Sequence, residues 1–407
     1  MMKVRAAVLR EIGLPAPYAQ SRPLSIEQVD LAPPGPGEVL LKVHAAGLCH
    51  SDLSAINGDR PWPMPIVIGH EAAGEVVELG EGVRDLAVGD HCVLVFRPSC
   101  GGCPSCAVGR PALCEPGGES NAAGSLLGGY KRLALTGGGR LNHHLGCSAF
   151  ADYAVVSRRS IVKIDADLPW EEAALFGCAV LTGAGAVLNT ARAEAGSRIA
   201  VVGLGGVGFS SLMAAAAIGA RDVIAVDMLD AKLDMARSMG ATAVFNARDP
   251  DVVAKVKEAT GGGVDYAFEM AGVVPALELA YRITRRGGTT VTAGLPNPAA
   301  QWPLQAVSLI AEERTLKGSY VGSCVPSRDV PRFVAMYRAG KLPVDRLMSE
   351  RVPLEDINAA LDRLARGESV RQVIQMARAA TRVVAANTRS TGQDSRGRRA
   401  RRRGGQR

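Results

Sequence analysis

Three residues that lie far apart in the chain have the side chains of a metal site that performs chemistry. They are Cys49 in GLCHSD, His70 in GHE and Cys178 in FGCAV. Two thiolates and one imidazole can hold zinc while leaving a fourth position open for water or a substrate oxygen. Taken singly, each of these cysteines is more often a small packed hydrophobe, and a lone histidine is more often a packed or surface residue. The prediction of a catalytic zinc site therefore depends on the other motifs of the chain.

Four further cysteines form a dense cluster in the segment CGGCPSCAVGRPALC, with glycines and prolines between them. Four soft thiolates on tight turns suit a closed tetrahedral zinc site with a structural role. The alternatives are an iron–sulfur cluster or four ordinary thiols, and the cluster alone would also fit a nucleic-acid-binding zinc ribbon. The predicted ligands of the structural zinc are Cys100, Cys103, Cys106 and Cys114.

Two carboxylates adjoin the candidate catalytic ligands. A metal-bound imidazole usually donates its other N–H to a carboxylate, and Asp52 is the candidate acceptor for His70. Glu71 is expected beneath the metal, where it could exchange onto zinc as water leaves. Both residues could instead be solvated acids or members of salt bridges.

A glycine-rich turn, Gly203–Gly208, follows the apolar run RIAVV and opens an alanine-rich stretch. Together with an acid at the end of the next apolar run, Asp227, this pattern is typical of dinucleotide binding, with the pyrophosphate at the helix N-terminus. Asp227 would bind both ribose hydroxyls and repel a 2′-phosphate, which favours NAD over NADP. Lys232 can reach the same ribose. The alternative is a glycine turn without a ligand. The predicted cofactor-binding residues of the turn are Gly203, Gly205, Gly206, Val207 and Gly208.

The elements that must position these residues fall into two kinds. The first 160 or so residues read as short alternating strands divided by proline- and glycine-rich turns. From about Trp170, strands alternate with helical stretches, which predicts an α/β fold with a doubly wound parallel sheet. After Lys317 the chain resembles its first part again and is expected to return to that domain. The clearest β-rich runs are 3–9, 37–47, 72–80, 90–96 and 152–164; the alternating part reads as strands 198–203, 222–227, 264–272 and 289–294 and helices 206–220, 229–241 and 275–287.

Length and composition indicate a globular protein of two or three domains, with 407 residues, 47% hydrophobic and 21% charged. The net charge of +7 belongs to the terminal segment 378–407, whose ten arginines and one acid give +9 and leave −2 for the rest. That basic tail is expected to be disordered. The start of the chain lacks the features of a signal peptide, and no apolar run is long enough for a membrane helix. Nine cysteines without an export signal favour reduced thiols, metal ligation and a cytoplasmic location.

In their order along the chain, these motifs resemble those of the zinc-dependent medium-chain alcohol dehydrogenases, in the longer, typically dimeric branch. The likeness runs from Lys3 to Met376 and rests on GLCHSD, GHEAAGEVVELGEGV, VGDHCVLVF, the four-cysteine segment, FGCAVLTG and VVGLGGVG. The resemblance implies a GroES-like β-rich catalytic domain interrupted by a Rossmann domain, with the active site in the cleft between them. The implied parts are 1–181 (catalytic, with the structural zinc lobe at 97–116), 182–322 (NAD-binding), 323–377 (return to the catalytic domain) and the tail 378–407.

The resemblance also implies roles for single residues. Ser51 corresponds to the hydroxyl that passes the substrate proton onward, and Phe96 lines the substrate pocket. His50 and Arg371 match positions that contact the pyrophosphate. Thr182 and Val207 match nicotinamide-side contacts. Two zinc ions per chain are implied, and Asp52 and Glu71 beside the catalytic zinc complete the implied active site.

Several positions depart from the family pattern or stay outside it. Many members end the proton relay with a histidine where this chain has Ser54, so the relay beyond Ser51 must use Ser54, water or another group. The acid typical of glutathione-dependent formaldehyde dehydrogenases has no clear match near Asp59 and Arg60. His143 and His144 are expected to be structural, and the surplus thiols are Cys92, Cys147 and Cys324.

The predicted function is reversible, NAD-dependent oxidation of a primary or secondary alcohol, with medium-chain or aromatic alcohols favoured over polyols. The protein is expected to be a homodimer. A polyol or threonine dehydrogenase, or a glutathione-dependent formaldehyde dehydrogenase, is the nearest alternative. A zinc-free reductase of the same superfamily would lack the metal ligands. A nucleic-acid-binding zinc protein is a more remote alternative, because only the tail is basic and aromatic residues make up 4% of the chain.

Overall fold

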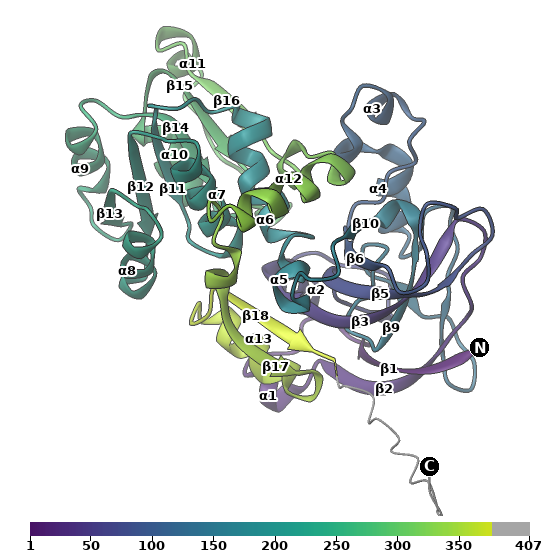
Figure 1. Cartoon of the computed structure of the whole chain (residues 1–407). Coiled ribbons are helices and arrows are strands. Elements are labelled where there is room, and N and C mark those ends of the chain that lie inside the picture. The colour runs from purple at the N-terminus through teal and green to yellow at the C-terminus, as the bar shows by residue number, and fades with distance from the viewer. Residues whose placement is uncertain (377–407) are drawn as a thin grey trace, which may run out of the picture. The chain divides into compact units, whose positions relative to one another are not determined.

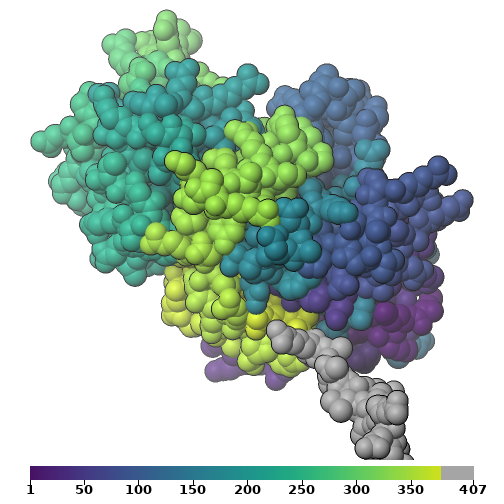
Figure 2. Space-filling view, in the orientation of Figure 1, coloured from purple at the N-terminus to yellow at the C-terminus, as the bar shows by residue number. Residues whose placement is uncertain are grey.

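The computed structural model describes residues 1–376, which contain three β-sheets and the helices that cover them (Figure 1). The basic tail predicted for 378–407 lies outside the described residues. Figure 2 shows the teal and green residues of the middle of the chain gathered on one side and the purple and blue N-terminal residues on the other. The yellow C-terminal residues lie between them at the bottom of that view.

The middle of the chain forms a six-stranded sheet in the order β13-β12-β11-β14-β15-β16, in which every neighbouring pair is parallel. This is the strand order of a doubly wound dinucleotide-binding sheet, with its reversal point between β11 and β14. The predicted α/β fold class is confirmed. The strands are β11 (Arg198–Val202), β12 (Asp222–Asp227), β13 (Ala243–Asn246), β14 (Val264–Glu269), β15 (Thr284–Thr292) and β16 (Thr315–Gly318). The helices are α7 (Gly206–Ala217), α8 (Asp230–Ser238), α9 (Val252–Ala259), α10 (Val274–Ile283) and α11 (Val307–Ala311).

Two predicted elements differ from the structure. The stretch 275–287 was expected to be one helix, but α10 ends at Ile283 and β15 starts at Thr284. The Thr284 hydroxyl bonds the Ala280 carbonyl (2.8 Å) and the Thr290 hydroxyl (2.8 Å), which secures the turn into the strand. The run 152–164 is two strands, because the turn Arg158–Ser160 interrupts it and the Arg158 guanidinium donates to the Ile161 carbonyl (3.0 Å).

The rest of the described chain forms a seven-stranded sheet in the order β10-β6-β5-β3-β18-β17, with β9 also paired to β3, and a five-stranded sheet in the order β7-β2-β1-β4-β8. The long strand β3 is central, since it pairs with β5, β9 and β18. The strands are β1 (Met2–Leu9), β2 (Leu24–Leu31), β3 (Glu38–Leu48), β4 (Ile66–Val67), β5 (Glu71–Leu79), β6 (His91–Leu94), β7 (Leu133–Leu135), β8 (Asn142–His143), β9 (Tyr153–Ser157), β10 (Ile161–Ile164), β17 (Met348–Pro353) and β18 (Arg371–Gln375).

The C-terminal strands return to the N-terminal sheet, as the sequence predicted. β18 runs antiparallel to β3, with Gln372 opposite Leu48. Three-residue to six-residue turns η1 to η6 and the remaining helices connect the strands. The helices are α1 (Tyr18–Ser21), α2 (His50–Ile56), α3 (Pro104–Ala107), α4 (Glu115–Ala122), α5 (Trp170–Leu175), α6 (Ala179–Gly185), α12 (Pro326–Arg338) and α13 (Ile357–Ala365); the turns are η1 (Pro111–Leu113), η2 (Arg158–Ser160), η3 (Ala186–Ala191), η4 (Val321–Ser323), η5 (Val344–Leu347) and η6 (Leu354–Asp356).

None of the helices in residues 1–376 has both the length and the apolar character needed to cross a membrane.

Candidate functional site

The candidate metal ligands lie where strand ends of the seven-stranded sheet meet a helix start. Cys49 follows β3 and caps α2, and His70 directly precedes β5. Gly47 of β3 pairs with Glu71 of β5, so the two segments arrive side by side. Cys178 precedes α6. One donor atom from each of Cys49, His70, Glu71 and Cys178 lies within 4.8 Å of all the others, and all four residues are buried.

Asp52 ties two of these residues together. One of its carboxylate oxygens, Oδ2, accepts the backbone N–H of Cys49 (3.0 Å), which closes the first turn of α2. The other, Oδ1, lies 3.0 Å from Nδ1 of His70. This contact directs the second ring nitrogen, Nε2, toward the thiols, since the Nδ1 side is taken by the carboxylate. The pairing predicted for Asp52 and His70 is present in the geometry.

His144 also lies at this carboxylate. Its Nδ1 is 3.6 Å from Asp52 Oδ1, its ring packs edge-on against His70 and Trp62, and it is fully buried. A structural role was expected for His144, but its contact with Asp52 could not be predicted, because only the tertiary fold brings these two residues together. His143 has the structural role expected of it, since its Nε2 accepts the Arg132 backbone N–H (3.0 Å).

Glu71 and Arg371 form a buried ion pair beside the metal donors. Arg371 Nη2 lies 3.3 Å from Glu71 Oε2, and Nη1 donates to the Leu48 carbonyl (3.1 Å). The other Glu71 oxygen accepts the Ala179 N–H (3.2 Å). Burial raises the pKa of Glu71 to about 7, and the Arg371 charge opposes that rise. Glu71 can therefore hold a proton or carry a charge near neutral pH, according to what lies beside it.

The pKa values of the two thiols and of the imidazole are shifted by their neighbours. A hydrogen bond from Cys178 lowers the pKa of the Cys49 thiol well below its usual range, and the same bond raises the pKa of Cys178. Burial acts to lower the pKa of His70, but the Asp52 carboxylate outweighs it and raises that pKa. His70 Nε2 is buried without a hydrogen-bond partner in the described residues. An unsatisfied imidazole nitrogen beside two thiols in a closed space fits a zinc ion.

The four cysteines of the dense cluster also converge. Their sulfur atoms lie within 4.8 Å of one another around the turns before and after α3. Cys114 Sγ accepts backbone N–H groups from Cys100 (3.2 Å) and Gly117 (3.4 Å), and Cys100 Sγ accepts from Cys103 (3.2 Å). Backbone N–H groups lower the pKa of Cys103 to about 6. Thiolates that are held by backbone donors suit a closed tetrahedral zinc site.

The glycine turn connects β11 to α7 at the carboxyl end of the parallel sheet. Gly203 has a φ of 94°, and a side chain there would meet the Ala271 backbone at 2.7 Å. Gly205 faces open space, whereas a Cβ at Gly206 would lie 2.8 Å from Arg371 Nε. Arg371 Nε and Nη2 are buried and lack hydrogen-bond partners in residues 1–376. Open space, a helix N-terminus and an unsatisfied guanidinium together fit a pyrophosphate.

Asp227 ends β12 and supports the glycine turn. Its carboxylate accepts the backbone N–H groups of Leu204 (2.7 Å) and Leu229 (3.0 Å). Lys232 lines a neighbouring cavity of about 490 Å³ together with Met228, Arg248 and other residues. Leu229, whose N–H is held by Asp227, also lines this cavity, and the adenosine part of a dinucleotide belongs beside such an acid.

The other predicted residues surround these groups. His50 and Ser51 are the first two residues of α2, whereas the Ser54 hydroxyl is engaged by the His50 carbonyl (2.9 Å). Thr182 lies buried on α6, which packs against α7 and Val207. Phe96 is buried with its ring edge-on to His70, at a centroid distance of 5.4 Å. The surplus thiols Cys92, Cys147 and Cys324 are fully buried, as expected of packing residues.

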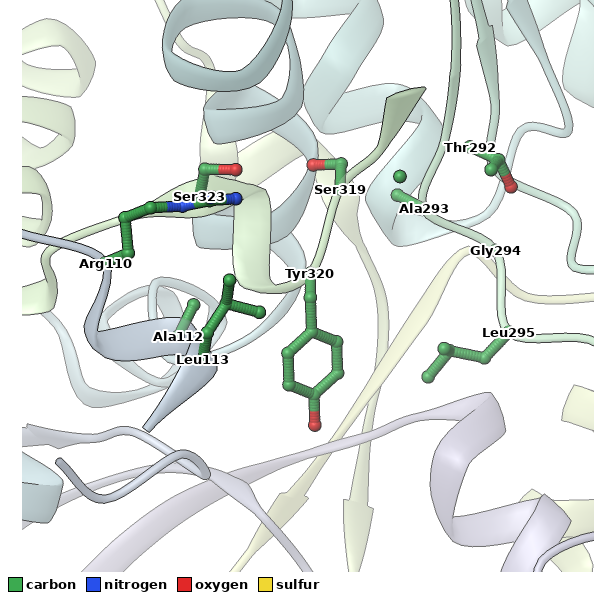
Figure 3. A pocket seen from close by; sticks show the side chains of 11 residues that line it. Arg110, Ala112, Leu113, Thr292, Ala293, Gly294, Leu295, Ser319, Tyr320 and Ser323 are labelled. Atoms are coloured by element: carbon green, nitrogen blue, oxygen red, sulfur yellow. The ribbon is translucent and has the colours of Figure 1, made fainter. Parts of the chain in front are cut away.

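Sequence reasoning missed the aromatic and cationic side chains beyond Phe96. Tyr320 packs edge-on to Phe96 with centroids 6.4 Å apart, and the Arg97 guanidinium lies over the Tyr320 ring at 5.4 Å. Tyr320 lies between β16 and η4, far from any motif. Figure 3 shows its ring projecting between Leu113 and Leu295. The aromatic character of Tyr320 in a segment of few aromatics was the only available signal.

Comparison with known proteins gives two family matches. Residues 35–166 match the alcohol dehydrogenase GroES-like domain, and residues 206–339 match the zinc-binding dehydrogenase domain. The GroES-like architecture expected for the β-rich part is thus confirmed, and the second match covers the six-stranded parallel sheet except for its strand β11 (Arg198–Val202). The exact domain boundaries stay predictions.

Whole proteins match over almost their entire length. S-(hydroxymethyl)glutathione dehydrogenase of Synechocystis sp. is 36% identical over 377 residues, which is 92% of this chain and 100% of that protein. A zinc-binding-domain alcohol dehydrogenase structure from Burkholderia ambifaria is 36% identical with a TM-score of 0.87, over 93% of this chain and 100% of that one. Benzyl alcohol dehydrogenase from Acinetobacter calcoaceticus is 32% identical with a TM-score of 0.86, over the same shares.

The contact between Asp52 and His70 leads to a testable prediction. Asp52→Asn preserves the size of the side chain but removes the charge that orients the imidazole, so zinc affinity should fall about 10–100-fold. Competition with a chromogenic chelator measures that affinity. Asp85→Asn, which changes a surface carboxylate paired with Arg158, is the matched control and should leave affinity unchanged. Equal zinc affinity in Asp52→Asn and the wild-type protein would contradict the role of Asp52.

Proposed function

This chain belongs to the zinc-dependent alcohol dehydrogenases, whose reaction is oxidation of an alcohol, and on that premise we propose that it passes the hydride to NAD at the site around Cys49, His70 and Cys178. The observation that carries the proposal is the position of Arg371. One face of its buried guanidinium meets Glu71 beside the metal donors, and its Nε faces the glycine turn at Gly206. A metal site and a dinucleotide site are thereby adjacent, as hydride transfer requires.

The residues of this chain have separable roles in the proposed reaction. Cys49, His70 and Cys178 hold the zinc, whose Lewis acidity together with the hydride acceptor NAD supplies the chemistry when both are bound. Asp52 orients His70, and Glu71 sits beneath the metal position, balanced by Arg371. Ser51, at the start of α2, accepts the proton of the substrate hydroxyl and passes it onward, while the hydride leaves the carbon for NAD.

The Ser54 hydroxyl was one candidate for the next step of the proton relay after Ser51. It already donates to the His50 carbonyl (2.9 Å), so it would have to rearrange before it could take part. Water at the exposed side of α2 is the simplest proposed continuation. Phe96 and Tyr320 wall the space next to His70 with aromatic surface and exclude water from it. Such a wall suits the body of an aromatic or medium-chain alcohol better than a polyol.

The cofactor residues are proposed from their places around the turn. Gly203, Gly205, Gly206 and Gly208 let the pyrophosphate approach the backbone at the N-terminus of α7, with Arg371 and His50 as cations. Asp227 and Lys232 face the adenosine ribose, and Thr182 and Val207 face the nicotinamide. The negative charge of Asp227 near the ribose disfavours the 2′-phosphate of NADP.

We expect two zinc ions per chain with unequal roles. Cys178→Ala should abolish turnover and remove one zinc while leaving the fold largely intact, because an open catalytic site contributes less to folding than a closed one. Cys103→Ala should instead lower the free energy of unfolding, since the closed site contributes to folding. Metal analysis and thermal unfolding measure both effects. One zinc or none in active wild-type protein would contradict the assignment.

The substrate and cofactor are tested together with a panel of ethanol, benzyl alcohol, a long-chain alcohol, sorbitol and S-(hydroxymethyl)glutathione, each with NAD and NADP. We expect benzyl or long-chain alcohol with NAD to give the highest kcat/KM. Asp227→Ser should raise relative NADP use by removing charge repulsion. Asp234→Ser, a surface change on α8, is the control. Equal or better efficiency of the wild-type enzyme with NADP would show that Asp227 does not select the cofactor.

We also propose a cytoplasmic homodimer. All nine cysteines are free thiols, which fits a reducing compartment. The edge strand β16 is exposed along its whole length, and Leu316, Val307 and Ile310 expose apolar surface there. An apolar open edge is a surface that a second copy of the chain can cover.

The dimer is tested by light scattering in solution. Leu316→Lys places a charge on the β16 edge and should shift the mass toward the monomer. Val88→Lys, at an exposed valine outside the parallel sheet, is the control and should leave the mass unchanged. A monomeric wild-type protein, or a dimer that Leu316→Lys does not weaken, would contradict an interface at β16.

A further inference from the structure

Three hydroxyl groups from two distant segments of the chain meet at a cavity of about 320 Å³. The Thr190 hydroxyl lies 2.8 Å from that of Ser319 and 2.8 Å from that of Ser323. Both serines line the cavity, as does Tyr320, which lies between them in the chain. Figure 3 shows the two serine hydroxyls directed toward one another, while the Tyr320 ring projects away from them. Because a hydroxyl donates one hydrogen bond and can accept others, Thr190 can bond both serines at once.

The turn that follows Tyr320, η4, has a backbone that needs such support. Its three residues, Val321, Gly322 and Ser323, have φ angles of 50°, 62° and 51°, so all three are in the left-handed region. Glycine adopts that region freely, but for a β-branched valine it is a rare and costly conformation. Strained backbone of this kind persists only where its surroundings hold it, and it is concentrated at active sites.

Other contacts attach η4 to α6 independently of Thr190. A Cβ at Gly322 would lie 2.3 Å from the Leu181 carbonyl oxygen, so the two backbones touch. The Cys324 thiol donates to the same carbonyl (3.3 Å). Because these contacts do not use the Thr190 hydroxyl, its removal should loosen the turn without detaching it from the fold.

Tyr320 depends on η4 for its place beside the metal donors. Its carbonyl accepts the Ser323 N–H (2.9 Å), which closes the turn. Its ring lies edge-on to Phe96 with centroids 6.4 Å apart, and Phe96 lies 5.4 Å from His70. The Arg97 guanidinium lies over the same ring at 5.4 Å. If the turn relaxed, only Phe96 and Arg97 would hold the ring, and the aromatic wall next to His70 would lose its fixed position.

Thr190 lies on an uncommon kind of helix. The six residues of η3 directly continue α6 and are wound as a π-helix, a wider form that occurs often at functional sites. At its other end, α6 begins directly after the metal donor Cys178. Thr190 therefore connects the helix that follows a metal donor to the turn that carries Tyr320.

We propose that Thr190 is a positioning residue that sets the preference of the enzyme for aromatic alcohols. Its hydroxyl joins the two serines, stabilises the left-handed turn and so holds the Tyr320 ring against Phe96. The inference rests on the proposed function, because it takes the reacting alcohol to lie beside Phe96 and His70. It goes beyond that function by naming the group that keeps the aromatic wall in place.

The test uses two variants that separate the hydroxyl of Thr190 from its shape. Thr190→Val keeps the shape and removes the hydroxyl, whereas Thr190→Ser keeps the hydroxyl. With NAD, Thr190→Val should lower kcat/KM for benzyl alcohol about fivefold, mainly through KM, because an ordered aromatic contact contributes about that factor. Ethanol has no ring to place against Tyr320, so its kcat/KM should change by less than about twofold. Thr190→Ser should stay within about twofold of the wild-type enzyme for both alcohols.

A double-mutant cycle determines whether Thr190 acts through Tyr320. Tyr320→Ala alone should lower kcat/KM for benzyl alcohol about tenfold, and the addition of Thr190→Val should then lower it by less than about twofold. Thr136→Val is the matched control, since the Thr136 hydroxyl also makes a hydrogen bond, to the Gln28 carbonyl (2.7 Å), but in the five-stranded sheet. It should leave both alcohols unaffected.

Three results would overturn the proposal. They are a Thr190→Val enzyme that loses nothing or loses the same factor for both alcohols, a Thr190→Ser enzyme as impaired as Thr190→Val, and a fivefold loss that persists beside Tyr320→Ala. In each case, oxidation of either alcohol by the wild-type enzyme would still uphold the proposed function.

Calorimetric binding of benzyl alcohol to the enzyme with NADH gives a readout that does not need turnover. Weaker binding to Thr190→Val than to Thr190→Ser supports the positioning role even if no alcohol is oxidised. In that case only the proposed function would fail. Equal binding to the two variants overturns the positioning role.

Discussion

A single buried cation, Arg371, holds the site together. It is 2% exposed, lies 3.3 Å from Glu71 and bonds the Leu48 carbonyl at 3.1 Å. A buried charge is stable only when neighbours compensate it, so the strand ends and the glycine turn that surround Arg371 cannot shift independently. Glu71 supplies part of this compensation at Nη2, and Nε, which faces Gly206 and has no hydrogen-bond partner in the described residues, leaves room for an anion. The metal donors and the cofactor turn thus share one electrostatic partner.

The two cysteine sites use the same donor atom in different surroundings. Cys49 and Cys178 are buried, and the hydrogen bond between them, together with their burial and the charge of Arg371, shifts the pKa values of both thiols. The lobe cysteines are mostly half-exposed and take their stabilisation from backbone N–H groups. A site governed by side chains can be tuned to a reaction, whereas a site governed by backbone depends only on the path of the chain.

The sequence predicted those parts of the site that local chemistry determines. The spacing of the four cysteines, the glycine turn after an apolar strand, and the need of a ligating imidazole for an acceptor located Cys103, Gly203 and Asp52. Cys49, His70 and Cys178 needed the resemblance to a family, because no spacing rule connects residues so far apart. The doubly wound sheet followed from its β–α alternation.

What escaped prediction depends on tertiary approach. Tyr320 follows β16 and belongs to no periodic pattern or motif, yet it packs on Phe96, which lies far earlier in the chain. His144 was expected to be structural, yet it reaches Asp52 because the 142–148 segment packs on α2. The end of α10 was misplaced because good helix formers continue up to Thr284, whose hydroxyl turns back on Ala280 and starts the strand.

The return of β18 to β3 has a consequence for the order of synthesis. Gln372 pairs with Leu48, and Arg371 arrives on the same strand, so the earliest and latest parts of the described chain must meet before the site is complete. Contacts of such sequence separation form slowly, and chains of this length fold domain by domain as they leave the ribosome. The parallel sheet can therefore form first, while the nascent chain still lacks Arg371 beside its metal donors. Activity is a property that the polypeptide acquires only after nearly all of it has been translated.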